Sequence, residues 1–585
     1  MAYPADSVPS KKYILTRSLQ VDRWLFAVLA CFTLLAWASW GKLEFPILDV
    51  GREVEISARI VAGQLLYRDV QTYYGPLAYY ANALALLLFG HHLEVFYTVG
   101  LALALARTLL VYRLAKRLTN ARWAALCTVC IQIYCALGPG LFNFIVPYSY
   151  GAVYATVLCL LAVTALDRYG CTGKTRWLVA AAIACGLAGL AKQEYGVAAL
   201  GGVLVGANLY SPQNLQTRVV RNVLVIVVTI ACVLLPLALL AKLVSWEKLY
   251  LSLLPITKVS LLNHSDFFQV SPAKTLYKWW HSFIVFAATT LVVWGSILAV
   301  HWISKRSWIP GNRGIRVLVE VIASVAFAWV GLSLLIKPVF RHSAIAVFHP
   351  LGDMSWFLPL LVGWFALVRP SLARYRHAPL LWTLLVFSLL LNARWLFYIN
   401  FYGLYATPVV LLFFTLLYHL AQRSSALVWR YLLVCLLIGG SMKLGDLAQY
   451  RYAVQSSHGT LYTKHAALAR AFNQTIDAIN ASSAASVLVL PEGSVLTFLT
   501  ATHSPIREIT FLPVVLPTSK DEREFLGRMQ VNPPELIVYV DRSFQEWGYR
   551  TYAEFNPLVD HWITQQHRLV DFFPKDEGAI RIYAR

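Results

Sequence analysis

The sequence predicts a polytopic α-helical membrane protein, with about 13 transmembrane helices, that ends in a small extracytoplasmic α/β domain. Of its 585 residues, 58% are hydrophobic and only 14% are charged, against ~25% charged residues in typical soluble proteins. Long apolar runs recur between residues 24 and 444. After about residue 450 the composition becomes that of a soluble domain. We therefore divide the chain into a transmembrane domain, residues 1–444, and a C-terminal domain, residues 445–585.

Thirteen apolar runs are each expected to cross the membrane. Lys and Arg recur in every second loop, starting with Lys11, Lys12 and Arg17 before the first run, and such loops mark the cytoplasmic side. The N-terminus is therefore expected in the cytoplasm and the C-terminal domain outside, across the cytoplasmic (inner) membrane of a bacterium. The predicted spans lie near residues 24–41, 95–115, 123–137, 148–166, 177–191, 197–209, 222–244, 282–301, 317–336, 354–368, 379–392, 404–420 and 431–444.

One further apolar stretch, "LAYYANALALLLFG" at residues 77–90, is shorter than the ~20 residues that a spanning helix needs. If it crossed the membrane, every later loop would invert against the charge pattern. We expect an amphipathic helix in the outer interface, with Tyr79, Tyr80 and Asn82 near the lipid headgroups. Residues 42–94 then form one long external loop.

The C-terminal domain shows alternating helical and strand patterns. Its central strands are expected in "SVLVL" and "ELIVYVD", which are short apolar runs rich in β-branched residues. The predicted order is a helix over 461–479, strands over 486–490 and 535–541, a helix over 552–567, and strands over 567–573 and 579–585.

The net charge of +21 raises the question of nucleic-acid binding. Residues 451–585 hold 13 Lys and Arg against 14 Asp and Glu, so the soluble part is nearly neutral. The positive excess lies in the membrane part, where it sets the topology, so nucleic acid is not expected as a partner. His342, His349 and Asp353 lack convincing metal-ligand spacing, and we expect no metal and no required cofactor.

The densest early charge cluster follows the first span, in "FPILDVGREVEISARI" (residues 45–60). Asp49 and Glu53 stand one helical turn apart, and Glu55 can pair with Arg59. The charges are also explained by a solvated helix face or by contacts with lipid headgroups. Asp49 differs because it stands at the end of a spanning helix, where a carboxylate is costly unless it has a function.

Residues 45–115 resemble the first external loop and second helix of the GT-C superfamily of membrane glycosyltransferases. The likeness is greatest to the branch of the protein O-mannosyltransferases and the bacterial aminoarabinose lipid A transferase. It rests on Asp49 after the first helix, "EISARIVAG" ending at Gly63, "YYGPLAYY", and "LLLFG" ending at Gly90. The span count and the external C-terminal domain also fit this superfamily.

The resemblance implies transfer of a sugar from a polyprenyl-phosphate-linked donor to a lipid, glycan or protein acceptor at the outer membrane face, with inversion. It implies Asp49 as the general base, which would take the proton of the acceptor hydroxyl. We expect Glu53, one turn further along, as a second catalytic residue that orients Asp49 or the acceptor. Two residues depart from the pattern. Val50 follows Asp49 where many relatives have Glu, and Gly75 stands where some relatives place a lysine that holds the donor phosphate.

The phosphate must therefore be held by residues from elsewhere in the chain. We expect Lys192, Arg341 and Arg394, cations at the outer ends of spans, to bind it. The alternative is that these side chains reach ordinary lipid headgroups. The remaining residues expected to contact substrate are Arg52, Arg68, Asp69, Tyr73, Tyr74, Glu194, Tyr398 and Asn400.

Two other classes of function compete with a transferase. One is a membrane transporter or flippase for a lipid-linked or polyanionic substrate, and the other is a non-catalytic scaffold that displays the outer domain. Transporters usually place essential charges near the bilayer midplane and carry internal repeats. This sequence shows no repeat and gathers its carboxylates at the outer face, which favours the transferase.

Overall fold

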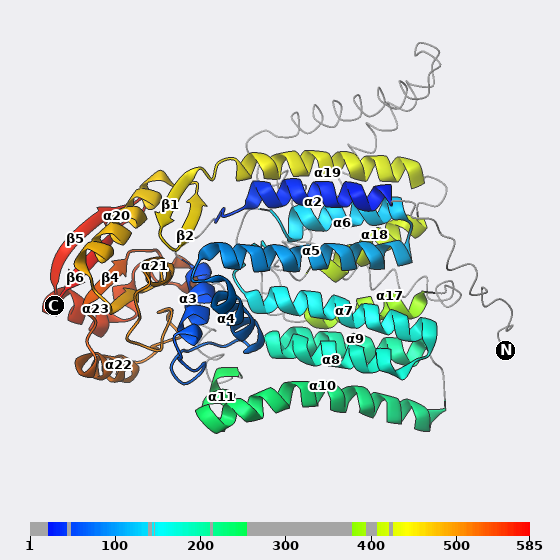
Figure 1. Ribbon diagram of the computed structural model, residues 1–585, viewed down its shortest axis with the longest axis horizontal. Helices are drawn as coiled ribbons and strands as arrows, with labels where there is room; N and C mark the ends of the chain where they lie inside the picture. Colours follow the sequence, from blue (N-terminus) through cyan, green and yellow to red (C-terminus); the bar gives the residue numbers. More distant parts are fainter. Residues whose placement is uncertain are drawn as a thin grey trace, which may run out of the picture.

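A bundle of long, nearly parallel helices is joined at one end to an α/β unit (Figure 1). The computed structural model describes residues 22–43, 48–138, 143–145, 147–210, 214–253, 377–392, 406–420 and 425–585, and it leaves out a few side chains within them, including that of Asp49. The predicted spans near 282–301, 317–336 and 354–368 lie outside the described residues.

Each predicted span within the described residues coincides with a helix of the bundle. Four of these helices are long and apolar enough to cross a membrane, over Leu93–Leu118, Tyr150–Thr172, Leu215–Val244 and Val428–Leu447. Shorter apolar helices of the bundle lie over Arg23–Ser39, Ala121–Cys135, Thr175–Ala191, Ala378–Leu391 and Thr407–His419. The bundle helices are α2 (Arg23–Ser39), α5 (Leu93–Leu118), α6 (Ala121–Cys135), α7 (Tyr150–Thr172), α8 (Thr175–Ala191), α9 (Gln193–Tyr210), α10 (Leu215–Val244), α17 (Ala378–Leu391), α18 (Thr407–Leu420) and α19 (Ser425–Leu447).

Helix α7 lies inside the bundle, whereas α10 lies at its edge (Figure 1). α7 packs on α5, α8 and α9, and small residues allow these helices to approach closely. α8 and α9 form a hairpin in which Lys192 alone separates them, and a Cβ at Gly196 would lie only 2.4 Å from the Cα of Gly189. α10 leaves Leu235 and Leu239 exposed on its surface, as expected for a helix that faces lipid.

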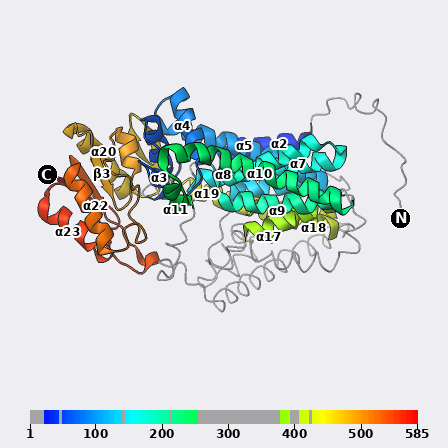
Figure 2. The same cartoon turned by 90° about the horizontal axis from the view of Figure 1, so that it is seen from below.

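The predicted external loop contains two short helices, α3 (Asp49–Val61) and α4 (Leu77–Phe89). They lie between the bundle and the α/β unit, and α11 (Trp246–Leu253) lies near them (Figure 2). α4 has 13 residues, too few to span a bilayer. Its far end exposes Leu87, Leu88 and Phe89, which suits an interfacial helix.

The expectation that Tyr79 and Asn82 of α4 lie near lipid headgroups was wrong. Both side chains are 1% exposed. The Tyr79 hydroxyl is bonded to Glu53, and the Tyr154 hydroxyl donates to Asn82 Oδ1 at 3.1 Å. Tyr79 and Asn82 face the protein because they form hydrogen bonds with Glu53 of α3 and Tyr154 of α7. The leucines at the end of α4 are therefore on its exposed face.

The α/β unit contains a four-stranded sheet in the order β3-β4-β6-β5, in which β3 and β4 are parallel and the other neighbours antiparallel. A separate antiparallel hairpin, β1–β2, precedes it. The elements are β1 (Tyr452–Ser456), β2 (Gly459–Thr463), α20 (Ala466–Ser482), β3 (Val487–Leu490), α21 (Val495–Thr500), α22 (Ser519–Val531), β4 (Leu536–Val540), the 3-10 turns η5 (Gln545–Trp547) and η6 (Tyr552–Glu554), α23 (Pro557–Gln566), β5 (Arg568–Pro574) and β6 (Ala579–Ala584).

The four predicted strands of this unit coincide with β3, β4, β5 and β6, but both predicted helices begin too early. The segment 459–463 pairs with β1 as a strand, so α20 begins only at Ala466. α23 begins at Pro557, because proline lacks an N–H and is favoured in the first turn of a helix. The β1–β2 hairpin and α22 were not predicted.

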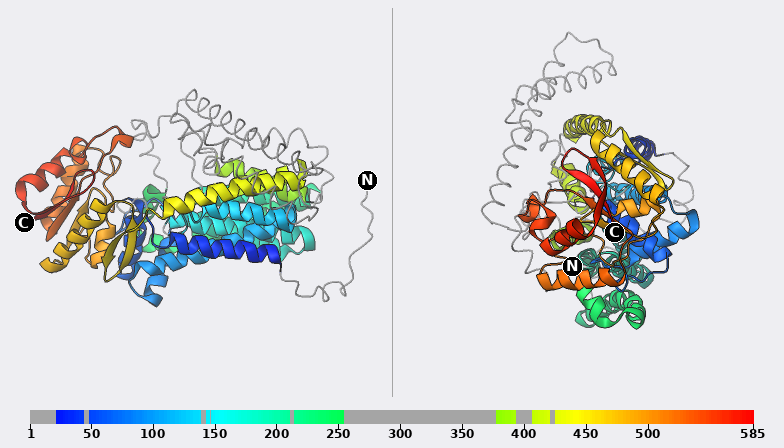
Figure 3. Two further views of the ribbon diagram at one scale, coloured as in Figure 1. Left: turned by 90° about the horizontal axis from the view of Figure 1, so that it is seen from above. Right: turned by 90° about the vertical axis from the view of Figure 1, so that its left-hand side faces the viewer.

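The α/β unit packs directly on the external loop (Figure 3). α21 lies against α3, and a Cβ at Gly51 would lie 2.4 Å from the backbone nitrogen of Val495. The β1–β2 hairpin is bonded to the bundle, since Thr460 N–H donates to Glu94 Oε1 at 3.1 Å. The α/β unit, called the outer unit below after its predicted side of the membrane, therefore packs on the loop of the predicted site.

Candidate active site

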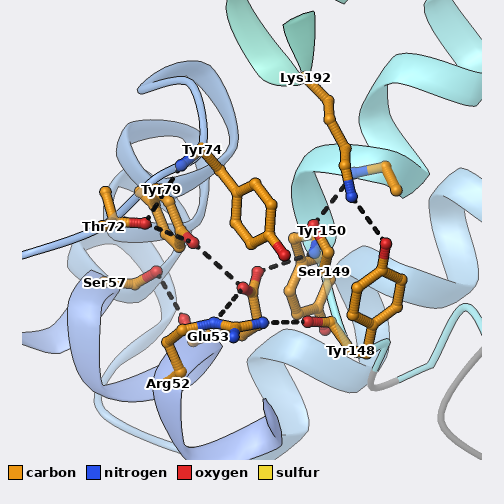
Figure 4. A network of polar contacts seen from close by, with 11 residues as sticks. Arg52, Glu53, Ser57, Thr72, Tyr74, Tyr79, Tyr148, Ser149, Tyr150 and Lys192 are labelled. Carbon is orange, nitrogen blue, oxygen red and sulfur yellow. Dashed lines mark hydrogen bonds and ion pairs between the residues drawn. The ribbon is translucent and has the colours of Figure 1, made fainter. Parts of the chain in front are cut away.

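The Glu53 carboxylate lies at the centre of a buried polar network (Figure 4). Its Oε1 accepts a hydrogen bond from the Tyr79 hydroxyl at 3.1 Å, and its Oε2 accepts one from the backbone N–H of Tyr150 at 2.8 Å. Tyr150 is the first residue of α7, and the amino end of a helix favours an anion. Glu53 thus ties α3 to the start of α7.

Arg52 extends from the same turn of α3 toward the segment that precedes α7. One guanidinium NH2 group donates to the Tyr148 carbonyl at 2.6 Å, and Nε lies 3.4 Å from Glu53 Oε1. The guanidinium also lies 5.3 Å from the centre of the Tyr74 ring, within the range of a cation–π contact.

Lys192, between α8 and α9, approaches the same ring from another element (Figure 4). Its ammonium lies 4.5 Å from the centre of the Tyr74 ring and donates to the Tyr148 hydroxyl at 2.7 Å. The side chain is only 2% exposed, and Glu194 Oε1 lies 3.7 Å from it. Burying a cation at a membrane border is costly unless the cation has a function.

Gly75 makes this arrangement possible. A Cβ at this position would lie 2.0 Å from the carbonyl oxygen of Leu190 and 3.2 Å from the carbonyl carbon of Ala191. The loop that carries Tyr74 can therefore press against the end of α8, beside Lys192, only because residue 75 has no side chain. The glycine that departs from the pattern of some relatives thus stands next to a lysine from elsewhere in the chain.

The other predicted substrate residues are less central. Arg68 and Asp69 form a partly exposed ion pair at 2.8 Å, and Asp69 Oδ2 accepts from the Leu65 N–H at 2.8 Å. The neighbouring residue Tyr67 contacts the outer unit through Arg507. The Tyr73 hydroxyl accepts a hydrogen bond from Gln71. Arg68 and Asp69 therefore shape the loop next to the outer unit, away from the Glu53 network.

Several predicted residues cannot be placed. Asp49 is the first residue of α3, but its side chain lies outside the described part of the structure. Arg341, Arg394, Tyr398 and Asn400 also lie outside the described residues. Their predicted roles stay predictions.

Three tyrosines of the network were not predicted as site residues. They are Tyr79, Tyr148 and Tyr150, which bind Glu53, Arg52 or Lys192. A signal was present for two of them, since "VPYSYG" places Tyr148 and Tyr150 at the start of the predicted span 148–166. Tyr150 acts through its backbone N–H, which no side-chain motif reveals.

Glu55 and Arg59 lie on another face of α3, where the outer unit covers them. They are 2% and 5% exposed, so the solvated face and the headgroup contacts considered for them were wrong. Arg59 donates to the carbonyls of Asp69 and Ile506 at 2.9 and 2.7 Å. Burial raises the pKa of Glu55 from its ordinary value of 4.5 to about 7, although Arg59 and Thr497 oppose the shift.

This pKa predicts a pH-dependent stability. The folded chain keeps the Glu55 proton up to about pH 7, whereas the unfolded chain releases it near pH 4.5. Between these values the unfolded state binds fewer protons, so stability falls as the pH rises. The melting temperature of the wild type should therefore fall relative to that of Glu55→Gln across this range. Glu524→Gln, at an exposed position of α22, is the matched control, and parallel melting curves for wild type and Glu55→Gln would contradict the assignment.

The network as a whole is suited to hold an anion. Two cations from different elements, Arg52 and Lys192, approach the one Tyr74 ring, and Tyr148 bonds to both of them. Arginine and lysine are the usual ligands of phosphate in proteins. Across the described ranges, no group of three or more His, Cys, Asp and Glu side chains is placed to bind a metal.

Residues 74–241, which include Tyr74, Tyr79, Tyr148, Tyr150 and Lys192, match the family model of dolichyl-phosphate-mannose-protein mannosyltransferases. The match begins at the second tyrosine of "YYGPLAYY" and ends within α10. It therefore covers the lysine and all the tyrosines of the network, but not Arg52 or Glu53. A comparison with curated protein sequences gives no match.

The chain is also similar to two solved membrane proteins. For ArnT from Cupriavidus metallidurans bound to undecaprenyl phosphate, the identity is 15% and the TM-score 0.43, over 96% of this chain and 98% of that chain. For the oligosaccharyltransferase from Archaeoglobus fulgidus in complex with Zn and sulfate, the identity is 14% and the TM-score 0.48, over 96% of this chain and 72% of that chain.

The TM-scores of both similarities are below 0.5. The relation to the GT-C superfamily is therefore based on the sequence match and on the motifs of residues 45–115. The matched segment contains "LLLFG" and all but the first residue of "YYGPLAYY", whereas Asp49 and "EISARIVAG" precede it in the chain. The resemblance to the GT-C superfamily of membrane glycosyltransferases is confirmed by this match over residues 74–241.

Proposed function

We propose that this protein transfers a sugar from a polyprenyl-phosphate-linked donor to a hydroxyl of a lipid, glycan or protein acceptor, at the outer face of the cytoplasmic membrane. The observation that carries the proposal is the approach of Arg52 and Lys192 to the Tyr74 ring, beside the loop that begins with Asp49. ArnT, one of the similar proteins, was solved with undecaprenyl phosphate. A lipid phosphate is the ligand that two cations at a membrane border suit best.

In the proposed reaction the acceptor oxygen attacks the anomeric carbon of the donor sugar. The bond between that carbon and the phosphate oxygen breaks, and the polyprenyl phosphate leaves with the bonding electrons. Attack opposite to the leaving group inverts the anomeric centre. Asp49 takes the proton of the acceptor hydroxyl as the new bond forms.

The cations act on the leaving group. Negative charge grows on the bridging oxygen of the phosphate as the bond breaks, and fixed cations in a water-poor site stabilise such charge strongly. The Lys192 ammonium, which Tyr148 and Tyr74 hold in place, is proposed to bind the phosphate. Arg341 and Arg394 are proposed to complete the phosphate site, as expected from the sequence.

Glu53 acts in this proposal as a positioning residue. Its two oxygens accept hydrogen bonds from the Tyr79 hydroxyl and the Tyr150 N–H, so both hold α3 against α4 and α7. Its effect on the reaction is to fix the turn of α3 that carries Arg52 and begins at Asp49.

The test is transfer of labelled sugar by the purified full-length protein in lipid vesicles. Undecaprenyl-phosphate mannose and undecaprenyl-phosphate glucose, each labelled in the sugar, are offered together with membranes from cells that lack the protein. A transferase releases undecaprenyl phosphate and labels a new product, whose anomeric configuration NMR can compare with that of the donor. Movement of intact donor across the vesicle, without cleavage, would instead support the transporter, and a protein that does neither with any donor offered would support the scaffold.

A further inference from the structure

The α/β unit contains a cavity of about 520 Å³ at the carboxyl ends of the two parallel strands β3 and β4. Pro491 follows β3, Asp541 and Arg542 follow β4, and residues near α23 and before β6 complete the lining. The volume is within the range of ~300–1,000 Å³ typical of small-ligand sites. In open α/β sheets, ligands bind outside the carboxyl ends of parallel strands.

The inner wall of the cavity consists of charges that hold one another in place. Arg581 pairs with Asp541, and its guanidinium lies 4.5 Å from the centre of the Tyr539 ring. The Tyr539 hydroxyl donates to Asp560 Oδ1 at 2.9 Å, and Asp541 Oδ2 accepts from the Ala579 N–H at 3.0 Å. Polar groups fixed in this way are pre-organised for a ligand, because little freedom remains to be lost on binding.

Other polar groups of the lining lack partners within the described ranges. The exposed side chains of Arg550 and Glu577 form no salt bridge there. The Tyr552 hydroxyl and the Arg581 Nε are buried without a hydrogen-bond partner among the residues described. Buried polar groups are nearly always hydrogen-bonded, so such groups in a cavity wall call for an explanation such as a ligand or water.

The charges of the lining favour a neutral, hydroxyl-rich ligand. Three arginines face three carboxylates, so the cavity offers no excess of either sign to an ionic ligand. Carboxylates only accept hydrogen bonds and guanidinium groups only donate them. Sugar hydroxyls do both, and neighbouring hydroxyls on one ring can bridge a carboxylate and an arginine.

We propose that this cavity binds a neutral saccharide, with Arg550, Glu577 and Asp560 as its hydrogen-bonding contacts. The proposal goes beyond the transfer reaction and does not depend on it. A saccharide at this place lies in the outer unit, apart from the network of Arg52, Glu53 and Lys192.

The experiment is saturation-transfer NMR on the purified full-length protein in detergent, without any lipid donor. The probes are three neutral trisaccharides, maltotriose, cellotriose and chitotriose, and one anionic trisaccharide, trigalacturonate. We expect saturation of at least one neutral probe and a weaker signal from trigalacturonate. Arg550→Ala should weaken the affinity for the bound probe about tenfold or more, because it removes a hydrogen bond from a charged donor. Glu577→Gln, which replaces a charged acceptor by a neutral one, should weaken it by a smaller factor.

The controls separate this cavity from the membrane site and from loss of fold. Arg523→Ala and Glu524→Gln change exposed charges on α22, outside the cavity, and should bind like the wild type. Lys192→Ala should also bind the trisaccharide normally, whatever it does to donor use. Binding of trigalacturonate alone, binding of none of the probes, or binding that Lys192→Ala abolishes and the cavity variants spare would each overturn the proposal.

Discussion

Asp49→Asn is expected to lower the turnover of sugar transfer by about 10²–10⁴-fold, while the fold and the binding of donor persist. Asparagine keeps the size and hydrogen-bonding geometry of aspartate but cannot take the acceptor proton. The measurement is single-turnover transfer from the labelled donor, with donor affinity and melting temperature determined on the same preparations.

Glu53→Gln is the informative partner of this variant. Glutamine can still accept from the Tyr79 hydroxyl and from the Tyr150 N–H, so the turn of α3 should persist and turnover should fall less than in Asp49→Asn. A dead Glu53→Gln beside a nearly normal Asp49→Asn would reverse the two roles. If both variants keep wild-type turnover, the loop is not the catalytic centre.

Lys192→Met is expected to weaken donor use by roughly 10- to 150-fold, which corresponds to the ~1.5–3 kcal/mol of a hydrogen bond to a charged group. Methionine fills most of the volume of the lysine stem between Tyr74 and Tyr148, so the packing of the buried side chain is largely kept. The effect should appear in the affinity for polyprenyl-phosphate sugars, measured by titration of the purified protein.

The matched control is Lys248→Met, which removes an exposed lysine of α11. It should leave donor affinity unchanged. Tyr148→Phe removes the hydroxyl that accepts from Lys192 at 2.7 Å and should weaken donor use less than Lys192→Met, because the charge stays. Normal donor affinity in Lys192→Met would mean that this buried lysine serves only the fold.

Most of the helical architecture could be predicted because the bilayer imposes long apolar runs and a charge asymmetry between loops. The strands β3 and β4 were predictable because short apolar runs rich in β-branched residues usually form buried strands. The β1–β2 hairpin was not predicted, since its residues "YAVQSSHGTLYT" read equally well as a linker and a helix start. Its pairing is favoured by contacts with Glu94 and Lys42 of the membrane part, which are remote in sequence.

The candidate site was predictable where a charge stood out from apolar surroundings. Arg52, Glu53, Tyr74 and Lys192 were all expected from the sequence, and the structure brings them together. The contributions of Tyr148 and Tyr150 were not foreseeable in the same way. The carbonyl of Tyr148 and the N–H of Tyr150 take part because of where α7 begins, and any residue type supplies these groups.

The contact of α21 with Gly51 also limits the path by which an acceptor can reach the start of α3. The backbone at Val495 covers α3 at Gly51, where even a Cβ would lie 2.4 Å from the Val495 nitrogen. Under the proposed function, an acceptor then reaches the loop that begins with Asp49 from a side of α3 that α21 does not cover. We therefore expect the α/β unit to restrict which acceptors fit beside α3, so its contact with Gly51 bears on acceptor choice as well as on stability.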